Sequence, residues 1–159
     1  MNWEPIGAVA EGLGAVGVIA SLMYVGIQVR ASTRAATVEA KLQSTRMYTD
    51  FVVLLVQSPE LNDLMLRGRK DLESLDQESY VRFSNLALIA FSFFSAAYFQ
   101  FSKGTLSDDD WTESEVIVQY WLHGKGCRQW WGKVGKHSFG RPFIEFVESE
   151  VAKMNEDQR

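Results

Sequence analysis

Apolar residues dominate one long stretch near the start of the chain, from Ile6 to Val29. It contains one charged residue, Glu11, and the 18 residues from Gly12 to Val29 carry no charge. A helix of that length covers about 27 Å, close to the thickness of the hydrocarbon core of a bilayer. The pattern predicts a single transmembrane helix. A cleaved signal peptide is the weaker alternative, because no Lys or Arg precedes the stretch.

Small residues recur on one side of this predicted span with a period of seven, and bulky residues occupy the other side. Close backbone approach over small residues is what brings helices together in lipid, and a seven-residue period predicts a left-handed crossing. The alternative is that glycine and alanine are simply common in membrane helices. We expect a helix–helix contact at Gly7, Ala10, Gly14, Gly17 and Ser21.

Glu11 lies beside this small-residue stripe. An ionisable group within a span marks a functional site by default, and a ring of helices would turn it into a ring of acids, as in cation pores. The alternative is an interfacial acid, because Glu11 is near the outer end of the span and its carboxylate can reach headgroup water.

Basic residues follow the span, with Glu39 as the one acid among them: Arg30, Arg34, Lys41 and Arg46. An excess of Lys and Arg marks the cytoplasmic side of a membrane helix. We therefore expect the N-terminus outside the inner (cytoplasmic) membrane and the C-terminal part in the cytoplasm. The same four residues are candidate contacts for lipid headgroups or a partner.

The seven-residue pattern continues past the span through Ala31, Ala35, Val38 and Leu42, and no helix-breaking residue occurs before Ser58-Pro59. We expect one long helix to about residue 57, with its contact stripe extending as a coiled coil. The chain then divides into a span (1–29), a juxtamembrane helical extension (30–57) and a cytoplasmic helical bundle (58–159). The predicted fold class is all-α.

Helix boundaries in the last part are marked by local chemistry. Ser58-Pro59-Glu60, Asp76 (or Ser74) and Ser107 are start signals, and Gly104 is a stop signal. We expect helices over about 77–103, over about 127–134 and over about 141–154, with a loop at 135–140.

The helix expected over 77–103 has no charge between Arg82 and Lys103. Its central apolar run of about 14 residues favours the buried centre of a bundle. A second span and a lipid-contacting helix remain open. Its aromatic stripe is expected to serve packing: Tyr80, Phe83, Phe91, Phe94, Tyr98 and Phe101.

Charge and cysteine content bear on whether the chain binds nucleic acid or a metal ion. The residues after the span carry a net charge of about −2, which offers no broad basic surface for nucleic acid. Cys127 is the single cysteine, which fits a reducing cytoplasm. His123, Cys127 and His137 lack a fourth ligand and match no zinc pattern. We expect no metal, no cofactor and no catalytic residue.

A basic cluster around Trp130 and Trp131 extends from Lys125 to Arg141. It is a second candidate contact for lipid or an acidic partner. The alternative is a solvated charged surface over two buried tryptophans.

The chain resembles a group of small bacterial membrane proteins of unknown function. The resemblance lies in the start Met1-Asn2-Trp3, the junction Gln28-Val29-Arg30, the turn Ser58-Pro59-Glu60-Leu61, the Gly104–Trp111 segment and the pair Trp130-Trp131. It implies a membrane-anchored helical protein and transfers no catalytic residue.

The sequence therefore predicts a non-enzymatic, single-pass membrane protein that self-associates and acts as a scaffold or partner-binding module. Two alternatives remain open: a homo-oligomeric ion channel with Glu11 near its mouth, and an accessory subunit whose span packs on a larger membrane complex. Its expected partners are membrane lipids, other copies of the chain and a membrane protein.

Overall fold

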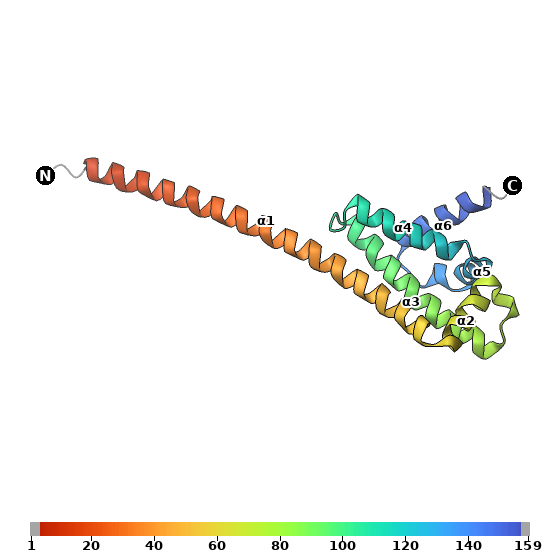
Figure 1. Cartoon of the computed structure of the whole chain (residues 1–159). Helices are drawn as coiled ribbons and strands as arrows, with labels where there is room; N and C mark the ends of the chain where they lie inside the picture. The colour runs from red at the N-terminus through yellow and green to blue at the C-terminus, as the bar shows by residue number, and fades with distance from the viewer. Residues whose placement is uncertain (1–3, 157–159) are drawn as a thin grey trace. The chain divides into compact units, whose positions relative to one another are not determined.

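The computed structural model describes the backbone of residues 4–156 and the side chains of residues 17–156, except residues 40 and 44. Within that part the chain forms six α-helices, two short 3-10 turns and no strand (Figure 1). The prediction of an all-helical chain is confirmed. The elements are α1 (Glu4–Gln57), α2 (Pro59–Lys70), η1 (Leu72–Ser74), α3 (Gln77–Ser102), α4 (Asp108–Leu122), α5 (Lys125–Lys133), η2 (Gly135–His137) and α6 (Arg141–Glu156).

Residues 1–39 and 40–159 form two separate units, and α1 contributes to both. The first unit is helical from Glu4 onward, and nearly all of its described side chains are exposed. The second unit contains the last part of α1 and all the other helices. The buried hydrophobic residues of the described part lie in this second unit.

Side-chain caps begin the helices of the second unit where the sequence predicts them. The Ser58 hydroxyl accepts a hydrogen bond from the Leu61 amide at 3.3 Å, and the Asp76 carboxylate accepts one from the Ser79 amide at 2.9 Å. Ser107 caps α4 in the same way. These caps satisfy amides that have no partner inside the first turn. Of the two residues considered for the start of α3, Asp76 is the cap.

Gly104 ends α3 as expected, since its φ of 68° lies in the left-handed region that favours glycine. The C-terminal part differs from the expectation in two details. Helix α5 begins at Lys125, two residues before the expected start, and residues Gly135–His137 form a 3-10 turn where a plain loop was expected.

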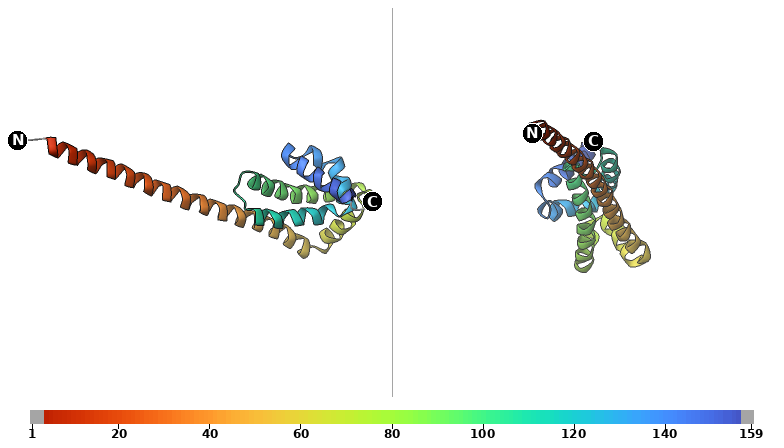
Figure 2. Two further views of the ribbon diagram at one scale, coloured as in Figure 1. Left: turned by 90° about the horizontal axis from the view of Figure 1, so that it is seen from above. Right: turned by 90° about the vertical axis from the view of Figure 1, so that its left-hand side faces the viewer.

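Helix α3 packs against α2, α4 and α6 in the second unit, and α5 packs against α2 and α4. Figure 2 shows α3 and α4 side by side, joined by the short connection around Gly104. The last part of α1 joins the unit through aromatic contacts. The Tyr48 ring lies 5.1 Å from that of Phe93, and the Phe51 ring lies 6.0 Å from that of Trp121.

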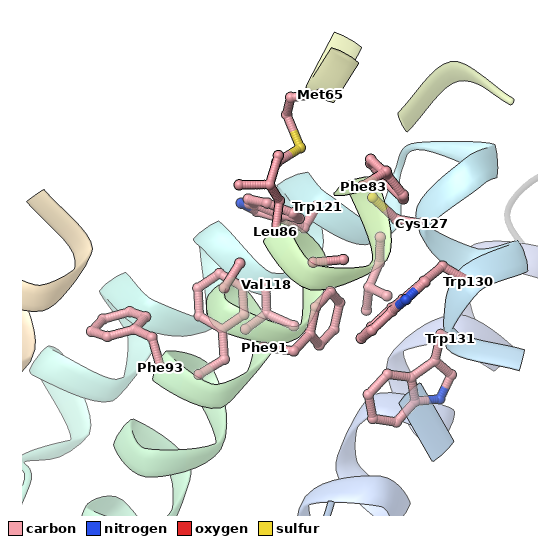
Figure 3. Packing of buried hydrophobic residues seen from close by; sticks show 14 of the residues in the cluster. Met65, Phe83, Leu86, Phe91, Phe93, Val118, Trp121, Cys127, Trp130 and Trp131 are labelled. Atoms are coloured by element: carbon pink, nitrogen blue, oxygen red, sulfur yellow. The ribbon is translucent and has the colours of Figure 1, made fainter. Parts of the chain in front are cut away.

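Phe91 of α3 is fully buried at the centre of an aromatic core (Figure 3). Its ring centroid lies 5.2 Å from that of Trp130, 5.3 Å from that of Trp131 and 6.2 Å from that of Trp121. Aromatic pairs at these distances add about 0.5–1.5 kcal/mol each beyond the burial of their area. The core thus joins α3, α4 and α5 through a few large rings.

Candidate functional site

The predicted contact stripe of the span lies mostly outside the described side chains. Gly7, Ala10, Glu11 and Gly14 belong to the helical backbone of α1, but their side chains are not part of the description. Gly17 has open space around it, and the Ser21 hydroxyl donates a hydrogen bond to the Gly17 carbonyl at 2.8 Å. Both stripe residues that the structure describes are exposed, and the Ser21 hydroxyl is satisfied within its own helix.

The four basic residues expected to contact lipid or a partner differ in their surroundings. Arg30, Arg34 and Arg46 are exposed. Lys41 is also exposed, but it forms an ion pair with Asp110 at the start of α4. This hydrogen bond raises the pKa of Lys41, and together with the Ser107 hydroxyl it lowers the pKa of Asp110. Lys41 therefore joins α1 to α4 within the second unit.

The acidic residues at the start of α4 stabilise the N-terminus of that helix. Asp108, Asp109 and Asp110 occupy its first turn, where the helix dipole stabilises negative charge. Across the residues whose side chains the structure describes, no three His, Cys, Asp or Glu residues are placed to hold a metal ion.

Trp130 and Trp131 lie in the core, where their exposed fractions are 0% and 3%. The Trp130 indole donates a hydrogen bond to the Ser84 hydroxyl at 2.8 Å, and the Trp131 ring stacks on that of Phe139 at 5.8 Å. Burial keeps both rings away from the surface on which a lipid or partner would be met. Lys125, Lys133 and Lys136 of the basic cluster are exposed, and the contact of this segment with lipid or an acidic partner stays a prediction.

Cys127 of α5 is fully buried, and Figure 3 shows it beside Phe83 of α3. Desolvation raises the pKa of its thiol to about 12, against a smaller opposing effect of Arg69. A nucleophilic cysteine needs a lowered pKa and access to its substrate, and this thiol has neither. The nearby His123 is exposed and hydrogen-bonds the Gln119 carbonyl at 2.8 Å through Nδ1.

Helix α3 carries an outward face that sequence reasoning did not separate from its buried face. Within the described part, α3 is the one helix long and apolar enough to cross a membrane, and 44% of its most apolar window is buried in the unit. The remaining residues form an exposed stripe with few polar groups. Four large apolar members are 38% to 60% exposed: Val81, Leu88, Ile89 and Phe99.

A shallow groove separates the end of α3 from the start of α6. It has a volume of about 180 Å³, with Tyr98, Phe99 and Phe143 among its walls and Lys103 at its rim. Such a volume is below that of typical ligand pockets, which is about 300–1,000 Å³. The groove is therefore a minor feature of the surface beside the α3 stripe.

No protein-family model, curated protein or solved structure matches the chain.

Proposed function

We propose that this chain is a non-enzymatic, single-pass membrane protein that self-associates and acts as a scaffold or partner-binding module. The observation that carries the proposal is the row of large apolar side chains along α1. From Val18 to Val29 these side chains are 52% to 68% exposed on a helix segment without charge. Leaving such area in water costs about 25 cal/mol per Å². A lipid environment removes this cost.

The charge pattern supports the proposed topology. Arg30, Arg34 and Arg46 are exposed just after the apolar segment, which favours a cytoplasmic position for this side of the span. The proposed arrangement is an N-terminus outside the inner membrane and a cytoplasmic unit beginning near residue 40. Its partners are membrane lipids, further copies of the chain and a membrane protein.

Alkaline extraction of membranes containing the full chain tests the anchor. A spanning protein stays in the membrane pellet at high pH, whereas a peripheral protein is released. Recovery of the intact chain in the supernatant would overturn the proposal. Fusion of a reporter that is active only in the cytoplasm to the C-terminus tests the orientation, and an inactive reporter on a stably made fusion contradicts it.

Self-association is tested by crosslinking and native mass spectrometry of the full chain in mild detergents. Replacing Gly14 with Leu is expected to reduce the oligomer, because a bulky side chain holds the two backbones apart. Val16→Leu, on the bulky side of the span, is the matched control and is expected to leave assembly unchanged. A monomer in every mild detergent contradicts self-association.

A further inference from the structure

The last part of α1, residues 41–57, covers one side of the aromatic core of the second unit. The Tyr48 ring lies 6.1 Å from that of Phe94, and the Phe51 ring lies 6.0 Å from that of Trp121. Phe94 and Trp121 are 0% and 3% exposed. Because two rings of α1 lie against them, their burial depends in part on this segment.

The segment is thinly attached compared with the other helices of the unit. Among those of its side chains that the structure describes, Phe51 is buried, Tyr48 and Leu55 are half-buried, and the others are exposed. Extensive packing joins α2, α3, α4, α5 and α6 with one another, and among the described residues α1 is not part of it. Segments with few buried apolar contacts open at a lower free energy than the core that they cover.

A cavity of about 50 Å³ lies between α1 and the surface that it covers. Thr45 of α1 lines it on one side, and Phe93 and Ala97 of α3 line it on another. Figure 3 shows Phe93 directed toward the tan ribbon of α1. The cavity leaves part of this interface without atomic contacts, and the lost contacts weaken the attachment of the segment.

An ion pair holds the N-terminal end of the segment. The Lys41 ammonium donates a hydrogen bond to the carboxylate of Asp110 in α4. The nearby charges of Asp109 and Glu113 attract the ammonium further. The side chain of Lys41 is 46% exposed, and partly exposed ion pairs contribute little to stability and are weakened by salt. The pair therefore biases the position of the segment without fixing it.

We propose that residues 41–57 form a lid that opens from the second unit while α2 to α6 stay folded, and that Lys41 is the residue that keeps the lid closed. The hinge is Ser58, the non-helical residue between α1 and α2, whose φ is −117° and ψ 99°. Opening of the lid uncovers the rings of Phe94 and Trp121.

The rest of the unit keeps its core when the lid is open. Phe91 of α3 packs on Trp130 and Trp131 of α5, and α5 is in close backbone contact with α2 at Gly126. None of these contacts includes a residue of α1. The lid belongs to the unit of residues 40–159, so the proposal does not rest on the membrane span.

Thiol labelling at position 97 of the full chain in mild detergent tests the lid. Ala97 is 1% exposed and lines the cavity beneath α1, which has room for a sulfur atom. The thiol of Ala97→Cys therefore reacts with a maleimide only when a path to it opens. Fully buried Cys127 of α5 is the internal control in the same molecule, and mass spectrometry after digestion separates the two sites.

Opening of the lid alone is expected to label Ala97→Cys about tenfold or more faster than Cys127 in the native chain, after each rate is divided by its rate in denaturant. Circular dichroism establishes that the variant is folded. Equal slow rates at the two sites would mean that position 97 is reached only by unfolding of the whole unit, and that result overturns the proposal.

Lys41→Gln tests the residue that keeps the lid closed. It is expected to speed the labelling of Ala97→Cys about two- to fivefold, because loss of a partly exposed ion pair shifts the equilibrium toward the open state. Lys41→Arg retains the charge and is expected to retain the slow rate. The matched control is Lys125→Gln, which breaks the ion pair with Asp71 elsewhere in the unit. The proposal is overturned if Lys41→Gln speeds labelling no more than Lys125→Gln does.

Tyr48→Ala separates the lid from the connection at Leu106, which also lines the cavity. The Tyr48 ring packs on those of Phe93 and Phe94, so its loss is expected to speed the labelling of Ala97→Cys at least as much as Lys41→Gln does. An unchanged rate would show that the thiol is reached by a route other than the lid, and it overturns the proposal.

Discussion

Gly126 of α5 contacts the backbone of Gly68 of α2 so closely that a Cβ at position 126 would lie 1.7 Å from the Gly68 carbonyl oxygen. The obstacle is main chain, which cannot turn aside as a side chain can. Gly68 also faces the Phe83 ring of α3. A Cβ at position 68 would lie 2.1 Å from Cδ2 of that ring. Two glycines therefore set the separation of α2 from α5 and from α3.

Gly126→Ala is accordingly expected to destabilise the second unit by about 3 kcal/mol or more, because α2 and α5 must move apart. The measurement is chemical unfolding of the full chain in mild detergent, followed by circular dichroism. Gly132→Ala, in the same helix, meets no atom within 4 Å and is the control. It is expected to stabilise the protein by about 0.5–1 kcal/mol, since alanine is the better helix former. Equal effects of the two variants would contradict the close contact.

Ser84→Ala is expected to cost about 1–3 kcal/mol of unfolding free energy, because it removes the acceptor of the buried Trp130 indole N–H. Ser149→Ala, which removes an exposed hydroxyl bonded to the preceding turn, is expected to change stability by less than about 0.5 kcal/mol. The same unfolding experiment measures both. A neutral Ser84→Ala variant would mean that the indole has another partner.

Acid is expected to destabilise the second unit through two carboxylates, those of Asp71 and Asp76. The Ser79 amide and hydroxyl lower the pKa of Asp76, and Lys125 and the Glu73 amide lower the pKa of Asp71. A carboxyl with a lowered pKa contributes stability that is present above its ordinary value of 3.8 and is lost as the pH falls through its folded value.

Asp76→Asn isolates one of these groups, because asparagine caps a helix as well as aspartate but does not titrate. The difference in melting temperature between pH 7 and pH 3 is expected to be smaller in this variant than in the parent chain. An unchanged difference would show that Asp76 takes no part in the acid response.

Cys127 is expected to resist thiol reagents in the native protein, because its buried thiol has a pKa of about 12 and little thiolate forms at neutral pH. Labelling with a maleimide, followed by mass spectrometry, is expected to modify Cys127 only after denaturant is added. The added thiol of Ser149→Cys is the exposed reference and should react at once. Rapid native labelling of Cys127 would contradict its burial.

Local chemistry made much of the fold predictable. Ser58, Asp76 and Ser107 cap helices because their side chains accept hydrogen bonds from backbone amides of the first turn. Gly104 ends α3 because glycine adopts a positive φ without strain. Such signals depend on a few adjacent residues. They require no knowledge of which helices meet in the folded chain.

Features that depend on distant residues were not predictable in the same way. The position of Trp130 and Trp131 under α3 follows from how α5 docks on α2, which their local sequence does not encode. Glu150 is a further example. It lies 2% exposed within the apolar face of α6, and its carboxylate accepts a hydrogen bond from Gln119 of α4 at 2.8 Å. The spacing of apolar residues alone does not predict that such an acidic residue is buried.

The small-residue stripe of the predicted span and the outward face of α3 differ in whether the sequence alone reveals them. The first is visible as a period of seven in the sequence. The second emerges only when the packed neighbours of α3 are known, because its residues are apolar on both sides. High apolarity without charge from residue 83 to residue 102 was the available signal, but it does not say which side faces inward.

The burial of Trp111, Trp121, Trp130 and Trp131 gives the second unit an intrinsic optical reporter. Indoles enclosed by hydrocarbon emit at shorter wavelengths than hydrated ones, so loosening of this unit should shift the fluorescence to the red. Trp121 lies against Phe51, and its emission should therefore also register the departure of the last part of α1. Movements of the last part of α1 thus become readable from the natural chain, without an attached dye.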